Sequence, residues 1–178
     1  MQTKILVYGD ERLRQSSDDV SSVDPLQDWI QTLFDTLNLY GGIGLAAPQI
    51  GLNHAIFVIN TFPQAAFDPT HEPFKAAFLN PQILWYSQRK MVFNEGCLSI
   101  PSIYENVLRP ESITVRYLNE RLEQIEETMN GIKARIFQHE FDHLHGRLFI
   151  DHLNVFQKAR IAYRLHQIKN NSHYHNLL

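Results

Sequence analysis

The segment His139-Glu140-Phe141-Asp142-His143 contains two histidines four residues apart and a glutamate directly after the first. On an α-helix of about 3.6 residues per turn, this spacing places both imidazoles on one face, one turn apart. Both rings can then bind one metal ion, and Glu140 can reach a water beside that ion. The motif therefore predicts a helix at this point and a metal site that needs a third ligand from elsewhere in the chain.

The residues around the motif have the pattern of such a helix. Asn130 and Gly131 are suited to its start, and Gly146 stands where a helix would end. Apolar residues recur between them at helical spacing; they are Ile132, Ile136, Phe137, Phe141 and Leu144.

Two further helices are predicted, one near each end of the chain. Asp24 is a good N-cap and Pro25 suits the first helical position, so a helix is expected from there to Gly41-Gly42. The segment from Asn154 onwards predicts an amphipathic helix. Its apolar stripe is expected to consist of Val155, Ala159, Ala162, Leu165 and Ile168.

Short apolar runs between these helices predict strands. Residues 55–60 form one such run, and runs at 76–79 and 83–86 are separated by a predicted turn at Asn80-Pro81. Residues 113–118 alternate between apolar and polar side chains and return at 124–129, which predicts a hairpin. Residues 61–73 contain three prolines and are predicted to form a loop.

These elements together predict an α+β fold. Short, mostly antiparallel strands from residues 55–128 are expected to wrap around the central metal-binding helix. The N-terminal helix is expected to pack outside, and the C-terminal helix to end the fold. Residues 1–170 are expected to form a single catalytic domain, and residues 171–178 a polar, frayed tail.

Composition excludes some classes of function. The 178 residues carry a formal net charge of −3, which argues against a wholly basic nucleic-acid binder, so no direct nucleic-acid function is expected. The sequence contains no apolar run long enough to span a bilayer, and no membrane association is expected. Its one cysteine, Cys97, has no partner for an internal disulfide, which favours a reducing, cytoplasmic setting.

The glycine-rich segment 42–49 has two interpretations. A phosphate-binding loop is disfavoured, because the third glycine of the dinucleotide motif and a Gly-Lys-Ser/Thr sequence are both missing. A tight structural loop, in which glycine permits close backbone approach, is the favoured interpretation. Gln49 is the residue of this segment whose side chain supplies a useful donor amide.

The third metal ligand is also open to more than one interpretation. Metalloproteases with this motif usually take it from downstream, where Asp151, His152, His166, His173 and His175 are available without a recognisable spacing. The alternative is Cys97, which lies upstream and whose thiolate suits Zn²⁺ or Fe²⁺.

Three segments resemble, in order, the motifs of the peptide deformylases, which remove the formyl group from the N-terminal methionine of new bacterial proteins. They are residues 42–49 (Gly-Ile-Gly-Leu-Ala-Ala-Pro-Gln), 95–99 (Glu-Gly-Cys-Leu-Ser) and 138–143 (Gln-His-Glu-Phe-Asp-His). The resemblance extends over about residues 4–165. It implies a bacterial-type, metal-dependent hydrolase that acts on N-formylmethionyl nascent polypeptides.

The resemblance also implies a set of catalytic residues. Cys97, His139 and His143 would ligate one divalent metal ion, with a water in the fourth position. Fe²⁺ is the ion expected from the family, and Zn²⁺, Ni²⁺ or Co²⁺ can occupy the same site; the thiolate is compatible with Fe²⁺. Glu140 would transfer the proton. The Gln49 amide and the backbone N–H of Leu98 would stabilise the oxyanion.

Substrate-binding residues follow from the same resemblance. The backbone of Ile43 and Gly44 would pair with the substrate in the manner of a β-strand. The methionine pocket would be lined by Ile43, Ile132 and Ile136, although both isoleucines of the helix also fit a purely structural role in the core.

The chain departs from the family at the edge of this pocket. Many deformylases have an arginine shortly after the proline of the second motif, whereas Tyr104 stands there in this chain. The substitution predicts an altered preference beyond methionine.

The C-terminal helix has two interpretations. It is rich in basic residues, and there is no Asp or Glu after Asp151. Some deformylases dock on the ribosome through such a helix; the alternative is a solvated basic face.

Two competing functions remain at this point. A zinc-dependent peptidase would use the same histidine motif, but Cys97 within Glu-Gly-Cys-Leu-Ser argues against it. A metal-stabilised binding module would have a closed coordination shell and would not need Glu140.

Overall fold

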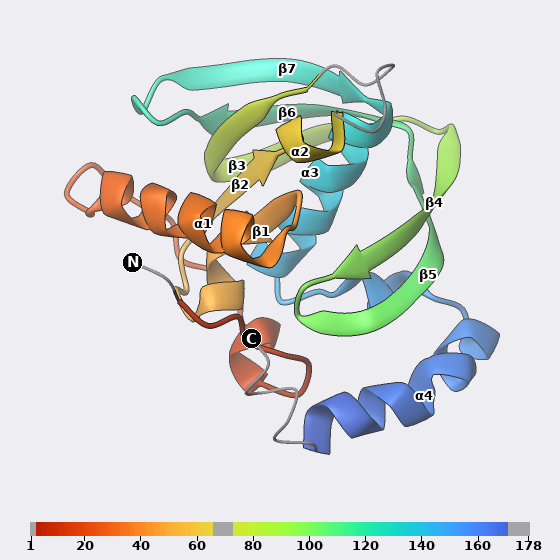
Figure 1. Ribbon diagram of the computed structural model, residues 1–178. Helices are drawn as coiled ribbons and strands as arrows, with labels where there is room; N and C mark the ends of the chain where they lie inside the picture. The colour runs from red at the N-terminus through yellow and green to blue at the C-terminus, as the bar shows by residue number, and fades with distance from the viewer. Residues whose placement is uncertain (1–2, 66–72, 171–178) are drawn as a thin grey trace.

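The computed structural model describes residues 3–65 and 73–170 and has the predicted α+β architecture (Figure 1). The predicted tail at 171–178 lies outside the described residues. Short 3₁₀ helices are η1 (Glu11–Arg14), η2 (Ala47–Ile50) and η3 (Phe149–His152). The α-helices are α1 (Leu26–Tyr40), α2 (Phe62–Ala65), α3 (Gly131–Leu144) and α4 (Val155–Asn170). The strands are β1 (Gly44–Ala46), β2 (Ile56–Asn60), β3 (Lys75–Tyr86), β4 (Lys90–Cys97), β5 (Ile100–Pro110), β6 (Ser112–Leu118) and β7 (Gln124–Asn130).

The described strands form two separate antiparallel sheets. The larger sheet has the order β1-β2-β3-β6-β7, and β4 pairs only with β5. The predicted hairpin is present, with Ile113 opposite Met129 and Tyr117 opposite Ile125 in β6 and β7. The two sheets share no backbone ladder within the described strands, although single backbone bonds flank the hairpin at both ends, from Tyr8 to Ser99 and from Glu111 to Arg89. Between α3 and the β4–β5 hairpin there is no backbone hydrogen bond in the described residues, so side chains join these two elements.

Helix α3 runs between the large sheet and the β4–β5 hairpin (Figure 1). Its Phe137 is fully buried and packs edge-on against Phe57 of β2 and Phe78 of β3, with ring centroids 5.0 and 5.2 Å apart. The motif residues His139 and His143 lie on the same helix. The period of about 3.6 residues therefore lets one helix carry both a core face and a metal-facing edge.

Helix α1 confirms the predicted N-terminal helix, but its start differs from the prediction. Leu26, Ile30, Leu33 and Leu37 are buried, and Gly41 ends the helix at φ +68°, a conformation that glycine adopts without steric cost. Asp24 does not cap α1. Its carboxylate instead accepts hydrogen bonds from the backbone N–H and hydroxyl of Ser21, so a local turn competes successfully for it.

The predicted turn at Asn80-Pro81 is a bulge within the single long strand β3. Asn80 has φ +46°, and the register with β6 shifts between Leu79 and Gln82. The Asn80 side chain bonds to both the backbone N–H and the carbonyl of Val20, at 2.8 Å each. This pair of bonds holds the bulge, and the strand continues because Pro81 falls at the irregular position.

Two smaller predictions were incomplete. Residues Phe62–Ala65 form one helical turn in the segment predicted as a loop, and residues 66–72 of that segment lie outside the described residues. Strands are predicted over residues 55–128 as a whole, but the β4–β5 hairpin within this range is not singled out.

The predicted apolar stripe of α4 was partly wrong. Ile161 and Ile168 are buried and Leu165 packs beside them, whereas Val155 is 79% exposed. The orientation of α4 about its own axis decides which residues are buried. Polar contacts at the start of the helix, where Gln157 and Arg160 bond to β5, set this orientation. None of the described helices is long and apolar enough to cross a membrane.

The aromatic contact between α3 and the large sheet generates a prediction about stability. Replacement of the fully buried Phe137 by alanine should lower the free energy of unfolding by about 3–5 kcal/mol, because it removes a large side chain and leaves a cavity. Denaturant unfolding followed by circular dichroism measures the change. Phe156→Ala is the control, because Phe156 is 87% exposed and its removal should change stability by less than about 0.5 kcal/mol. Equal effects of the two substitutions would contradict the assigned packing.

Candidate active site

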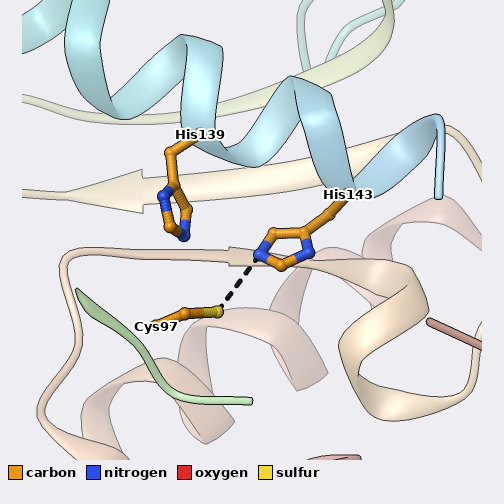
Figure 2. Close-up of side chains that lie close together, drawn as sticks. All are labelled: Cys97, His139 and His143. Carbon is orange, nitrogen blue, oxygen red and sulfur yellow. Dashed lines mark hydrogen bonds between the residues drawn. The ribbon is translucent and has the colours of Figure 1, made fainter. Parts of the chain in front are cut away.

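Three side chains with metal-ligating atoms meet where the end of β4 approaches α3. Cys97, His139 and His143 offer one sulfur and two nitrogen atoms that all lie within 4.8 Å of one another. The Cys97 Sγ lies 3.3 Å from the Nε2 of His143, and Figure 2 shows the three side chains pointing toward a common space. One thiolate and two imidazoles are a donor set that suits Zn²⁺ or Fe²⁺.

The orientation of His139 is held by a buried carboxylate. Its Nδ1 lies 3.0 Å from Oε2 of Glu95, which is only 6% exposed. Although burial favours the neutral acid, hydrogen bonds from His139 and Arg109 hold the pKa of Glu95 well below its usual range. An ionised Glu95 accepts a hydrogen bond from Nδ1–H, so the Nε2 lone pair remains available to a metal ion.

The environment of Cys97 favours its thiolate. Burial by itself raises the pKa of the thiol, but the neighbouring His143 and His139 lower it to about 5. The thiolate is the form of cysteine that binds metals. The residues present therefore fit a divalent transition metal ion by both their chemistry and their proximity.

Glu140 lies beside this cluster with a free carboxylate oxygen. The residue is 3% exposed, and its Oε2 has no hydrogen-bond partner among the described residues. Burial raises the pKa of Glu140 to about 7, against the opposing effects of His139 and His143. Such a carboxyl group can both accept and release a proton near neutral pH.

Gly44 of β1 makes room for the Glu140 carboxylate. A Cβ atom at this position would lie 2.3 Å from Oε1 of Glu140, which is far closer than two such atoms can approach. The absence of a side chain at Gly44 is therefore a geometric requirement of the Glu140 position.

Gln49 points its amide nitrogen toward Cys97. Its Oε1 accepts a hydrogen bond from the backbone N–H of Ala46 at 2.8 Å, which fixes the amide orientation. Its Nε2 then lies 3.4 Å from Cys97 Sγ and 3.2 Å from the Ser99 hydroxyl. Gln49 is 2% exposed, so a donor is held in a nearly water-free position next to the cluster.

A cavity of about 490 Å³ opens beside these groups. It is lined by ten of the eleven residues that the sequence predicts for the site, and His143 is the exception. These residues are Ile43, Gly44, Gln49, Cys97, Leu98, Tyr104, Ile132, Ile136, His139 and Glu140. Segments far apart in the sequence thus meet at one concave surface, as is usual for small-molecule and peptide sites.

Tyr104 lies at the edge of the cavity and is 67% exposed. It stands opposite Gly96 in the β4–β5 hairpin, and a Cβ on Gly96 would lie 2.4 Å from the tyrosine ring. The ring therefore covers the glycine backbone and presents an aromatic surface at the rim.

A buried network of charges behind the metal cluster was not predicted from the sequence. Arg109 of β5 bonds to both oxygens of Glu95, at 2.8 and 3.0 Å, and to Asp142 of α3. Arg135 of α3 bonds to Glu95 at 2.7 Å, and His152 lies 2.7 Å from Asp142. The two carboxylates are thus neutralised inside the protein by two guanidinium groups.

Few features of the sequence point to this network. Glu95 lies two residues before Cys97 and Asp142 directly before His143, both within motif segments, but a sequence motif does not identify their partners. Arg109 follows the alternating burial of Ile103, Glu105 and Val107 along β5, and this alternation could have suggested that its side chain points inward.

Comparison with known proteins gives a consistent result. The family model described as polypeptide deformylase matches residues 2–159. A peptide deformylase from Pseudothermotoga lettingae is 40% identical over 169 residues, covering 94% of this chain and 92% of that protein. One from Salinibacter ruber is also 40% identical, covering 93% of this chain and 88% of that protein.

Solved structures agree in fold as well as in sequence. A peptide deformylase from Legionella pneumophila is 36% identical with a TM-score of 0.81, covering 95% of this chain and 96% of that one. Peptide deformylase 1B from Arabidopsis thaliana is 34% identical with a TM-score of 0.85, covering 99% of this chain and 95% of that one. Peptide deformylases are metal-dependent hydrolases that remove the N-formyl group from nascent peptides. The chain belongs to the polypeptide deformylase family.

Proposed function

We propose that this chain hydrolyses the formyl amide of N-formylmethionyl peptides at a divalent metal ion held by Cys97, His139 and His143. The observation that carries the proposal is the convergence of these three ligands beside the buried Glu140 in one cavity. Because the substrates are nascent chains, we propose that the enzyme works in the cytoplasm.

The metal ion is proposed to be Fe²⁺ in the native enzyme, with Zn²⁺, Ni²⁺ or Co²⁺ able to occupy the same ligands. A thiolate donates more charge than a third imidazole and leaves a softer centre, which is compatible with Fe²⁺. When bound, such an ion supplies Lewis acidity that activates water and polarises a carbonyl group.

Glu140 is proposed to transfer the proton during hydrolysis. Its carboxylate first accepts a proton from the attacking water and then delivers it to the amine that leaves. Burial supports this role, because it brings the pKa of Glu140 to about 7, where both the protonated and the ionised forms are accessible.

Gln49 and Leu98 are proposed to stabilise the negative charge that develops on the formyl oxygen. The Gln49 amide is already oriented by Ala46, and its Nε2 lies beside the metal-ligand cluster, 3.4 Å from Cys97 Sγ. The backbone N–H of Leu98, next to Cys97, would be the second donor. Removal of one such donor typically costs about 2.7–4 kcal/mol of transition-state stabilisation.

Ile43, Gly44, Ile132 and Ile136 are proposed to bind the substrate. Gly44 begins the edge strand β1, so one side of its backbone is available for pairing with an extended peptide. Ile132 and Ile136 line the cavity one turn apart on α3 and provide apolar surface for a methionine side chain.

A zinc peptidase with a downstream ligand is the second candidate, and the observed contacts disfavour it. Asp151 pairs with Arg14 at 2.5 Å, and His152 is bound to Asp142. His173 and His175 lie outside the described residues. A closed binding module is disfavoured because the cluster contains only three ligating side chains in the described part of the chain.

The proposed function predicts selective release of formate. Metal-loaded protein should release formate from formyl-Met-Ala-Ser and leave unformylated Met-Ala-Ser intact, as measured by a coupled formate assay and mass spectrometry. Glu140→Gln should keep its metal but lose at least about 10²-fold in kcat, because the proton acceptor is removed. Cys97→Ala should lose the metal as well. Cleavage of the unformylated peptide bond, or full activity of Glu140→Gln, would contradict the proposal.

Tyr104 is proposed to determine preference at the residue after methionine. Tyr104→Arg should raise kcat/KM for formyl-Met-Asp-Ser relative to formyl-Met-Leu-Ser by about two- to fivefold, the range expected for an exposed ion pair. The change should shrink at high salt. Tyr104→Phe is the control and should keep the original ratio, and an unchanged ratio in Tyr104→Arg would rule out contact with that residue.

Helix α4 is proposed to dock on the ribosome. It has no acidic residue, and Phe156 and Tyr163 are 87% and 72% exposed near Lys158 and Arg164. Exposed aromatic and cationic groups together suit an RNA surface.

Charge reversal tests this docking. Lys158→Glu with Arg164→Glu should reduce co-sedimentation with ribosomes by about tenfold at low salt, because the phosphate contacts are lost. The control carries the same change of charge at positions outside α4, as Lys90→Glu at the start of β4 with Arg121→Glu in the turn between β6 and β7. Equal binding of both variants would leave α4 as an ordinary solvated face.

A further inference from the structure

The side chain of Arg135 occupies an unexpected place for a cation. It is 4% exposed and lines the same cavity as Ile132 and Ile136, which precede and follow it on one face of α3. A buried charge is costly, and replacement of buried ion pairs by apolar side chains is often neutral or stabilising. An arginine between the two isoleucines of the α3 wall therefore calls for a specific reason.

The guanidinium group reaches three acceptors on the β4–β5 hairpin. Its Nη1 donates to Glu95 at 2.7 Å and to the Val107 carbonyl at 3.1 Å, and its Nη2 donates to the Met91 carbonyl. Met91 and Glu95 lie on β4, whereas Val107 lies on β5. The fixed fork of donors in arginine suits this arrangement, and a lysine cannot reproduce it.

Phe93 of β4 packs against the guanidinium group. The centre of its ring lies 5.0 Å from Arg135 Cζ, and both residues line the cavity. The α3 wall of the pocket and the β4 wall are therefore joined directly through Arg135. Other polar links between α3 and the hairpin run from His139 to Glu95 and from Asp142 to Arg109 on the metal side. Gln138 adds a bond to the Pro110 carbonyl at the end of β5, so Arg135 makes the link beside Phe93.

We propose that Arg135 is the residue that sets the width of the methionine pocket, by clamping the middle of the β4–β5 hairpin, around Phe93, onto α3. Because no backbone hydrogen bond joins α3 to β4 or β5 in the described residues, the separation of these walls depends on side-chain links. Loosening of the Arg135 link widens the pocket where the substrate side chain enters. Glu95 keeps its bonds to Arg109 and His139, so the metal ligands stay in place. The inference rests on the proposed deformylase function, and Arg135 acts as a positioning residue for substrate selectivity.

Arg135→Lys is the variant that tests the clamp, because it keeps the positive charge but loses the forked set of guanidinium donors. It should retain its metal and keep kcat for formyl-Met-Ala-Ser within about threefold, while KM rises. The ratio of kcat/KM for formyl-Met-Ala-Ser to that for formyl-Phe-Ala-Ser should fall by about tenfold, the range in which pockets discriminate between apolar side chains. Arg116→Lys is the control, because Arg116 forms an exposed ion pair with Glu126 on the far hairpin.

The outcomes separate this inference from the proposed function. If the wild-type protein does not deformylate formyl-Met-Ala-Ser, the proposed function fails. If the wild-type protein is active and Arg135→Lys keeps the methionine-to-phenylalanine ratio, or loses activity equally on both peptides, the clamp is overturned. Arg135→Gln serves as a second variant if Arg135→Lys does not fold. Failure of both to fold would make Arg135 a requirement of the fold and would also overturn the proposal.

Discussion

The buried carboxylate of Glu95 is shared by one imidazole and two guanidinium groups. His139 and Arg135 approach it from α3, and Arg109 approaches it from β5. Each charge is costly to bury alone and acceptable only with its partners, so the members of the network depend on one another. The network joins α3 to the β4–β5 hairpin, between which the described residues make no backbone hydrogen bond. The position of His139 and the closure of the cavity both follow from it.

The candidate site could be predicted largely from the sequence because its chemistry is concentrated in short segments. The spacing of His139 and His143 requires a helix, and the periodic apolar residues around them predict that same helix. Cys97 could be singled out only by the resemblance of its neighbours to a known motif, because the third ligand of a metal site has no fixed sequence distance. The structure brings it to the two histidines across the gap between β4 and α3.

The features that could not be predicted are those decided by tertiary contacts. The burial of Arg109 and Arg135 depends on the distant acceptors that surround them, and the sequence does not identify these partners. The sequence Asn80-Pro81 is typical of a turn. In the structure, hydrogen bonds between the Asn80 side chain and the backbone of the distant Val20 stabilise it as a bulge. The apolar residues of α4 fit more than one stripe, and its contacts with Glu105 and Asn106 select the one that is buried.

The contact between Gly44 and Glu140 has a consequence for inhibition and resistance. A ligand that pairs with the backbone at Gly44 recognises a position where any added side chain would displace the Glu140 carboxylate. Substitutions that block such a ligand would also disturb the group proposed to transfer the proton. Resistance by direct change at this contact is therefore coupled to loss of turnover, and escape has to arise at the rim of the cavity instead.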